Sequence, residues 1–277
     1  MPALSPVPDD TIAAPQPAIP QEDFKVNQDL LKRVASNLQL QAEEMEGPSD
    51  SLFNVLSSSA LGCLALSLHQ GVANISNTLW QTPASLAPIS KKVERRYFVP
   101  AKDHEYLYSH LAPNSLVVKS VNHREDKDAR RLDAFGRKVY SLASFQLRVA
   151  NHQSLLSQYD FHLWGSLPKF EPLLPEWDKK DFKALVEEGA ATVKMTLQAA
   201  SDTADTAARS MASMISMRRA LWLLLSGLSA KVQSLMRDLL FDGKALFAIQ
   251  MDVHLHGMKE SQTFLQTLGL YVPPATE

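Results

Sequence analysis

The longest regular pattern of apolar positions in this chain runs from residue 186 to residue 225. Apolar residues recur there at alternating steps of four and three, at Val186, Ala190, Val193, Leu197, Ala200, Ala204, Ala207, Met211 and Met214, and the series resumes after Arg218 at Leu221 and Leu225. An average step of about 3.5 residues is the period of a helix that keeps one stripe against a partner helix. Residues 176–225 contain no proline and a single glycine, Gly189, so the pattern predicts one helix about 75 Å long.

A helix of this length has to lie along other long helices, from its own chain or from another subunit. A second long helix is predicted over 126–167, where an apolar stripe is formed by Leu132, Phe135, Val139, Leu142, Leu147 and Ala150. The prolines Pro168, Pro172 and Pro175 lie between the two helices and predict a short turn. Helices joined in this way usually fold back antiparallel. Because Arg218 interrupts the long seam, we expect it to help set the register of the packed helices.

Shorter periodic runs predict further helices over 21–46, 52–68, 104–110, 114–121, 229–239, 244–253 and 258–269. The segment 96–99 is the only convincing β-like tetrapeptide and is too short to found a sheet. The segment Phe241-Asp242-Gly243 predicts a turn in which the glycine takes a positive φ. The fold class predicted is therefore all-α, an elongated helical bundle built on long antiparallel coiled-coil helices. Residues 1–20 hold six prolines and are expected to form a disordered tail.

Charge is unevenly distributed along a chain whose formal net charge is only -2. Residues 1–50 carry nine acids and three bases, whereas residues 91–138 carry twelve bases and seven acids. The densest basic cluster is Lys91, Lys92, Arg95 and Arg96, with a single acid among them. Three interpretations stay open for this cluster: a nuclear import signal, a patch that binds nucleic acid, and ordinary solvated surface charge.

Compartment and membrane association follow from two simple features. Cys63 is the only cysteine, which excludes an intrachain disulfide and is typical of proteins in the cytosol or nucleus. No stretch approaches the roughly 20 uninterrupted apolar residues of a membrane span. We therefore expect an intracellular, soluble protein that does not bind membranes.

Candidate catalytic and metal-binding patterns are weak. His254 and His256 follow Asp252, but their surroundings predict helix, where residues two apart point in different directions. His104, Glu105 and His110 resemble an acid–base cluster only by spacing. The sequence lacks a glycine-rich phosphate loop and a serine nucleophile elbow. We expect no enzymatic activity, no cofactor, no metal and no small-molecule substrate.

Three ordered blocks of sequence resemble a known family. The first comprises 96–102, 105–110 and 113–118, the second comprises 131–140, 148–151 and 159–161, and the third comprises 218–219, Trp222, 226–229 and 241–247. These blocks resemble the C-terminal domain of the lamina-associated polypeptide 2 alpha family. They are equally similar to the Gag-type first reading frame of DIRS-type retroelements, from which that domain is thought to derive. The resemblance covers roughly residues 21–272, and residues 273–277 would form a second tail.

The resemblance implies an all-helical, elongated homodimer with a four-helix antiparallel coiled coil at its centre, which binds A-type lamins and associates with chromatin. We therefore expect a non-enzymatic, nuclear structural or interaction protein, with the cytoplasm as the alternative location. The alternative function is a Gag-like structural protein of a DIRS-type retroelement that self-assembles and binds nucleic acid. The hypothetical dimer seam comprises Val193, Leu197, Ala200, Ala204, Ala207, Met211, Met214 and Leu221, supported by the helix near 126–160.

Overall fold

The computed structural model describes residues 21–45, 63–80, 88–109, 111–112, 127–226, 230–237, 239–241, 243 and 245–247. These residues are mostly helical, which confirms the predicted helical character of the chain. They divide into two compact units. The first contains the described residues up to 80 together with 187–192, and the second contains the described residues from 88 to 186 and from 193 onward.

The first unit contains a small antiparallel sheet that the sequence pattern does not predict. Helix α1 (Gln21–Leu38) is followed by strand β1 (Ala42–Met45), and strand β2 (Cys63–Leu66) precedes helix α2 (Gln70–Trp80). The strands pair with Ala42 opposite Leu66 and Met45 opposite Cys63. The backbone N–H of Leu64 donates to Gln28 Oε1 at 2.8 Å, which ties β2 to α1.

Two predicted helices are therefore wrong in part. The helix predicted over 21–46 ends at Leu38, because Gln39 takes a left-handed backbone conformation with φ of 52°. Residues 63–66 of the helix predicted over 52–68 form β2, and residues 52–62 lie outside the described residues. Helix α2 begins at Gln70, just beyond the end of the predicted helix. The imidazole Nδ1 of His69 accepts from the N–H of Gly71 at 3.2 Å in the first turn.

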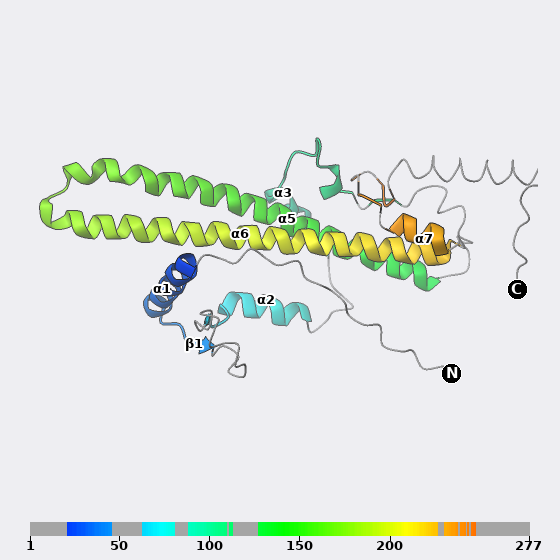
Figure 1. Ribbon diagram of the computed structural model, residues 1–277, viewed down its shortest axis with the longest axis horizontal. Coiled ribbons are helices and arrows are strands. Elements are labelled where there is room, and N and C mark those ends of the chain that lie inside the picture. The colour runs from blue at the N-terminus through cyan, green and yellow to red at the C-terminus, as the bar shows by residue number, and fades with distance from the viewer. Residues whose placement is uncertain are drawn as a thin grey trace, which may run out of the picture. The chain divides into compact units, whose positions relative to one another are not determined.

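The second unit is built on the two predicted long helices, and both are confirmed. Helix α5 (Lys127–Ser166) and helix α6 (Glu176–Leu225) are joined by the 3₁₀ segment η4 (Leu167–Leu173) and run antiparallel side by side (Figure 1). Asp133, early in α5, contacts Arg218 and Trp222, late in α6. The remaining elements of this unit are helix α3 (Lys91–Arg96), the 3₁₀ turn η3 (Glu105–Leu107) and helix α7 (Ala230–Arg237).

Smaller predictions in this unit have mixed outcomes. The β-like tetrapeptide is wrong, because Arg96 ends α3 and residues 97–99 form no strand. Only η3 is found within the helix predicted over 104–110, and α7 lies inside the one predicted over 229–239. Residues 245–247 are bends, so the helix predicted over 244–253 is wrong at its start. Gly243 has φ of +75°, as expected of the turn. The helices predicted over 114–121 and 258–269 lie outside the described residues.

The main hydrophobic core of this unit lies where α5 begins and α6 ends. Its buried members come from η3 and the segment after it, both long helices, α7 and the segment after α7: Leu107, Leu111, Tyr140, Ala143, Met211, Ile215, Trp222, Leu223, Met236, Leu246 and Phe247. Close approach of the two helices requires the glycine at position 136. A Cβ placed there would lie 2.8 Å from both Arg218 Cγ and Met217 Cε, which is closer than non-bonded carbon atoms tolerate.

Candidate functional site

The seam predicted on α6 is largely buried within a single chain. Val193, Ala200, Ala207 and Met211 are buried, Ala204, Met214 and Leu221 are partly buried, and only Leu197 is exposed, at 38%. Their cover includes the chain's own α5: Met211 borders the same cavity as Tyr140 and Leu147 of that helix. The sequence allowed this stripe to pack on helices of its own chain or on another subunit, and in the structure it packs on its own chain. Burial of this seam therefore needs no second subunit.

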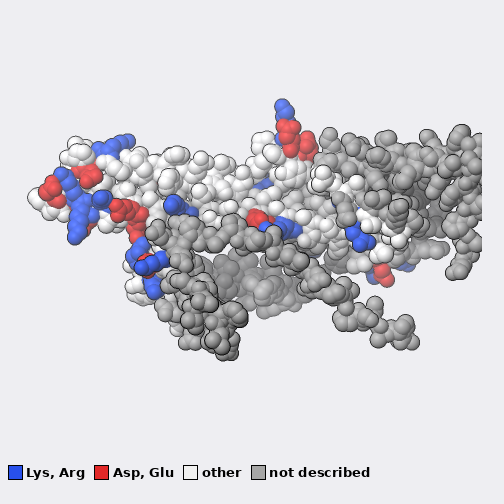
Figure 2. All heavy atoms as spheres, viewed as in Figure 1, with Lys and Arg blue, Asp and Glu red and all other residues white. Residues whose placement is uncertain are grey.

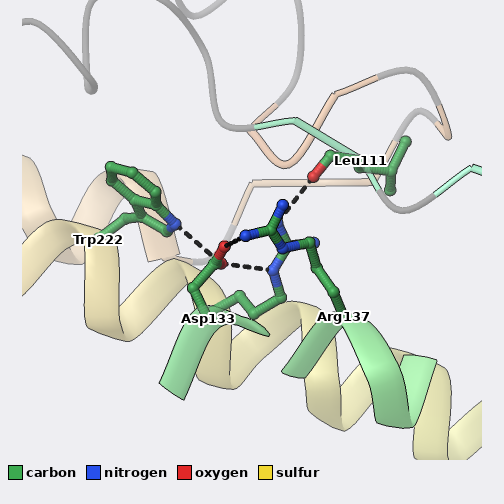
Figure 3. Close-up of polar contacts among 5 residues, drawn as sticks. Leu111, Asp133, Arg137 and Trp222 are labelled. Carbon is green, nitrogen blue, oxygen red and sulfur yellow. Dashed lines mark hydrogen bonds and ion pairs between the residues drawn. The ribbon is translucent and has the colours of Figure 1, made fainter. Parts of the chain in front are cut away.

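Arg218 belongs to a buried polar cluster that joins the two long helices and includes Leu111, Asp133, Arg137 and Trp222 (Figure 3). Its side chain is 1% exposed, its Nε donates to Asp133 Oδ1 at 2.8 Å, and its Nη2 donates to the carbonyl of Leu111 at 2.8 Å. The indole Nε1 of Trp222 donates to the same Asp133 oxygen at 3.1 Å, and Arg137 Nη2 lies 3.0 Å from the other oxygen. A charge pair in this position fixes the register of α5 against α6, in agreement with the role expected of Arg218.

Electrostatics in this cluster favour a charged carboxylate. Burial acts to raise the pKa of Asp133, but the hydrogen bond and charge of Arg218, with help from Trp222 and Arg137, bring that pKa below its usual value. The sequence alone did not identify Asp133 as the buried partner of Arg218. Its spacing of four from Arg137 is visible in the sequence, but it also fits an ordinary surface pair. We assign the cluster a structural role, because its hydrogen bonds and ion pairs join groups of the protein itself; Arg218 Nη1 alone among its nitrogens is buried without a hydrogen-bond partner in the described part of the chain.

The predicted basic cluster lies on α3 and points away from the protein. Lys91, Lys92, Arg95 and Arg96 are all exposed, whereas the carboxylate of Glu94 turns inward and pairs with Arg148 Nη2 at 3.0 Å. Arg148 is buried, and its guanidinium lies over the ring of Tyr108 at 4.5 Å. The helix therefore separates the one acid in this segment from the four bases. The result is a small, predominantly positive surface, on which the Glu94 side chain remains 46% exposed.

The outer side of α5 carries a second apolar stripe, which we call the outer stripe. It consists of Leu132, Phe135, Val139, Leu142, Val149, Leu156 and Leu163. Phe135 is 62% exposed and Leu156 is 69% exposed, while Leu142 and Val149 are partly buried. The positions follow alternating steps of three and four, with Gln146, Gln153 and Asp160 at the intervening places. The described residues thus leave uncovered a stripe with the period of a helix-pairing seam.

The stripe that the sequence predicted for this helix mixed two different faces. Ala150 is fully buried and Leu147 is partly buried, whereas Leu132, Phe135 and Val139 face outward. The buried face of α5 is instead formed by small and polar residues: Ala129, Asp133, Gly136, Tyr140, Ala143, Ser144, Arg148, Ala150 and Ser157. The prediction of a single apolar packing stripe on this helix is wrong for that reason.

The half of the outer stripe next to η4 is hollowed into a groove of about 600 Å³. Val149, Gln153, Leu156 and Leu163 line it from α5, together with His152, Ser157, Tyr159, Asp160, Tyr97 and Thr196. Asp160 is the only Asp, Glu, Lys or Arg between residues 149 and 166. Figure 2 shows the same contrast, with charged side chains gathered at the η4 end and a largely uncharged surface along the adjoining stretch of α5. This groove suits an apolar side chain of a partner better than a charged ligand.

The described residues provide no metal site of three or more His, Cys, Asp or Glu side chains. His254, His256, Asp252 and His110 lie outside them, and the imidazole of His104 packs edge-on against Tyr106. Among the helices in the described part of the chain, none combines the length and apolar character needed to cross a bilayer. No protein-family model, curated protein or solved structure matches the chain. The outer stripe and the α3 surface are therefore the features of the described residues that bear on function.

Proposed function

We propose that this chain is a non-enzymatic structural protein that forms a homodimer by burying the outer stripe of α5. The observation that carries the proposal is the exposure of that stripe, because large apolar side chains repeated along one face are costly to leave in water. The α6 seam is already buried against the chain's own helices and does not need a second copy. The dimer would therefore be two hairpins packed through α5, giving the four-helix antiparallel coiled coil implied by the family resemblance.

The size of the surface is adequate for this role. Residues 132–163 of a helix span about 47 Å, and a helix is about 10 Å across with its side chains. Two such faces together bury on the order of 1,000 Å², which is about the lower bound for a specific interface. Contacts near η4, where Trp177 and Leu173 are each 79% exposed, would add to this area. We therefore expect a dimer that dissociates measurably on dilution.

The test is sedimentation velocity on a double variant, Phe135→Glu with Val139→Glu, beside the unmodified chain. Two carboxylates placed in the stripe would be buried without partners in the dimer, so we expect the dissociation constant to rise by at least about 100-fold. Ala134→Glu is the matched control, since Ala134 is an exposed neighbour on the same helix but lies outside the stripe. A double variant that dimerises as tightly as the control would refute the proposal.

We propose A-type lamins and chromatin as further partners and the nucleus as the location, supported by the sequence resemblance alone. The direct assay is binding of purified A-type lamin tail to the purified chain. Saturable binding would support A-type lamins as partners. No binding at concentrations where the chain is dimeric would refute that assignment. The dimer itself does not depend on that outcome.

A second candidate function is nucleic-acid binding by a Gag-like particle protein, and the specific observation in its favour is the α3 surface. Its four exposed bases could contact four phosphates, which would give a salt dependence of slope about -3 for single-stranded RNA. Replacing Lys91, Lys92, Arg95 and Arg96 with alanine should abolish that slope. A control with Lys169, Lys179, Lys180 and Lys194 replaced removes the same charge elsewhere. An equal loss of RNA binding in both sets of variants would indicate that net charge alone drives the binding. Particles in electron micrographs would favour the Gag-like alternative.

A further inference from the structure

Arg148 of α5 is buried with fewer hydrogen-bond partners than its side chain can use. It is 3% exposed, and its Nη2 donates to the carboxylate of Glu94 at 3.0 Å. Its Nε and Nη1 are buried too, yet neither has a hydrogen-bond partner in the described part of the chain. These two nitrogens carry more than half of the N–H groups of a guanidinium. Because buried donors nearly always find an acceptor, they indicate a bound species that completes the contacts of Arg148.

The aromatic rings beside Arg148 do not supply the missing acceptors. The guanidinium carbon lies 4.5 Å from the ring centre of Tyr108 and 5.4 Å from that of Phe145. Such contacts stabilise the positive charge through the faces of the rings. The N–H groups instead lie in the plane of the guanidinium and need acceptor atoms near that plane. The hydroxyl of Tyr108 is already hydrogen-bonded to the backbone of Val99. The rings therefore hold the charge in place and leave its donors open.

A cavity of about 290 Å³ borders Arg148, and residues of both long helices line it. Leu147 of α5 and Ala204 of α6 belong to its apolar lining, while His104 and Asn151 add polar groups. A second cavity that borders Arg148 has only about 50 Å³, which is room for about one or two water molecules. The larger cavity is close to the lower limit of ligand pockets, roughly 300 Å³. Apolar walls beside a buried cation suit an organic molecule with one charged end.

Charge selects a carboxylate as that charged end. Guanidinium groups bind carboxylates and phosphates through charge-assisted hydrogen bonds. Glu94 already places one negative charge beside Arg148, so a dianionic phosphate would meet more repulsion than a single carboxylate. Among the described residues that line the larger cavity, Arg148 is the only Lys or Arg that could offset further negative charge. A monoanion therefore fits the electrostatics of the site better than a phosphate.

We propose that this cavity binds a small organic monocarboxylate. The carboxylate of the ligand accepts hydrogen bonds from Arg148, and its apolar part packs against Leu147 and Ala204. All the residues that line the cavity belong to one chain, so the site does not depend on the proposed homodimer.

Isothermal titration calorimetry of the full chain with benzoate tests the proposal, with benzamide as the uncharged probe of the same shape and ionic strength held constant. We expect saturable binding of benzoate and none of benzamide. Arg148→Met removes the charge and the donors but keeps a long side chain, so the dissociation constant for benzoate should rise by at least about 10-fold. Arg209→Met is the matched control, because it removes a cation from the exposed side of α6. That control should bind benzoate as the unmodified chain does.

Two further variants decide the question if Arg148→Met does not fold. Ala204→Met fills the cavity from α6 and leaves the guanidinium intact, so it should abolish benzoate binding while circular dichroism shows that the helices are retained. Glu94→Gln removes the carboxylate that competes for Arg148, so benzoate should bind several-fold more tightly. A purely structural role for the pair of Glu94 and Arg148 predicts no such tightening.

Three results would overturn the proposal. Benzoate that does not bind, or binds no more tightly than benzamide, would show that the buried charge does not recruit a carboxylate. Unchanged benzoate binding in Ala204→Met would place the binding elsewhere on the chain. Tighter binding of inorganic phosphate than of benzoate would refute the assignment to monocarboxylates.

Discussion

The two ends of the α5–α6 hairpin differ in how much of their apolar surface is buried within one chain. At the end where α5 begins, the core residues of η3, α7 and the segments that follow them pack on the helices, and Arg218 and Asp133 form a buried pair. Toward η4, Ala200 and Val193 of α6 are buried against the hairpin, but Leu156, Leu163, Leu173 and Trp177 are exposed. The first end combines a buried core with the exposed stripe residues Leu132, Phe135 and Val139, whereas the second leaves most of its large apolar residues exposed for a partner to cover. The difference separates residues required for folding from residues available for association.

Removing the buried ion pair should give the largest effect on stability. Asp133→Ala leaves Arg218 buried without its carboxylate partner, so we expect a loss of about 3–5 kcal/mol in the free energy of unfolding. Asp205→Ala is the matched control, because Asp205 pairs with Arg209 at 2.6 Å on the exposed side of α6 and such pairs contribute less than about 1 kcal/mol. Urea denaturation measures both variants. Similar midpoints for the two would contradict the structural role of Asp133.

Two glycines of α5 provide a second comparison of the same two ends. Gly136→Ala introduces a Cβ against Arg218 and Met217 and should destabilise the fold by about 1–3 kcal/mol. Gly165→Ala, near η4, has no atom within 4 Å of the new Cβ and should stabilise the helix by roughly 0.5–1 kcal/mol. Thermal denaturation gives the sign of each change. Equal signs would show that the helices are not closely packed at position 136.

Acid should weaken the first end of the hairpin before it affects the second. Because the pKa of Asp133 is lower in the folded than in the unfolded chain, its contribution is fully present above the unfolded value of about 3.9 and is lost as pH falls through the lower folded value. The measurement is the urea midpoint from neutral to acidic pH, for the unmodified chain and for Asp133→Asn. The unmodified chain should lose more stability than the variant over this range. A parallel decline in both would assign the acid sensitivity to other carboxylates.

The sequence predicted the two long helices and their antiparallel turn because a period of 3.5 residues and flanking prolines are local signals. It did not predict which side of α5 faces α6. The inward side carries Asp133, Gly136, Ser144 and Arg148, whose burial depends on partners far away in the sequence. The pairing of β1 with β2 also joins segments that are far apart in the sequence, so the local helical periodicity of each segment did not predict it. The exposed stripe residues were visible as apolar positions, but only the structure shows that they lack cover among the described residues.

Sedimentation equilibrium of the unmodified chain, over a wide range of concentration, measures whether two copies associate. Burial of the outer stripe in a second copy predicts a mass of two chains at high concentration, falling toward one chain on dilution. A mass of one chain at every concentration would show that the outer stripe of α5 stays exposed to solvent, and it would refute the proposed homodimer.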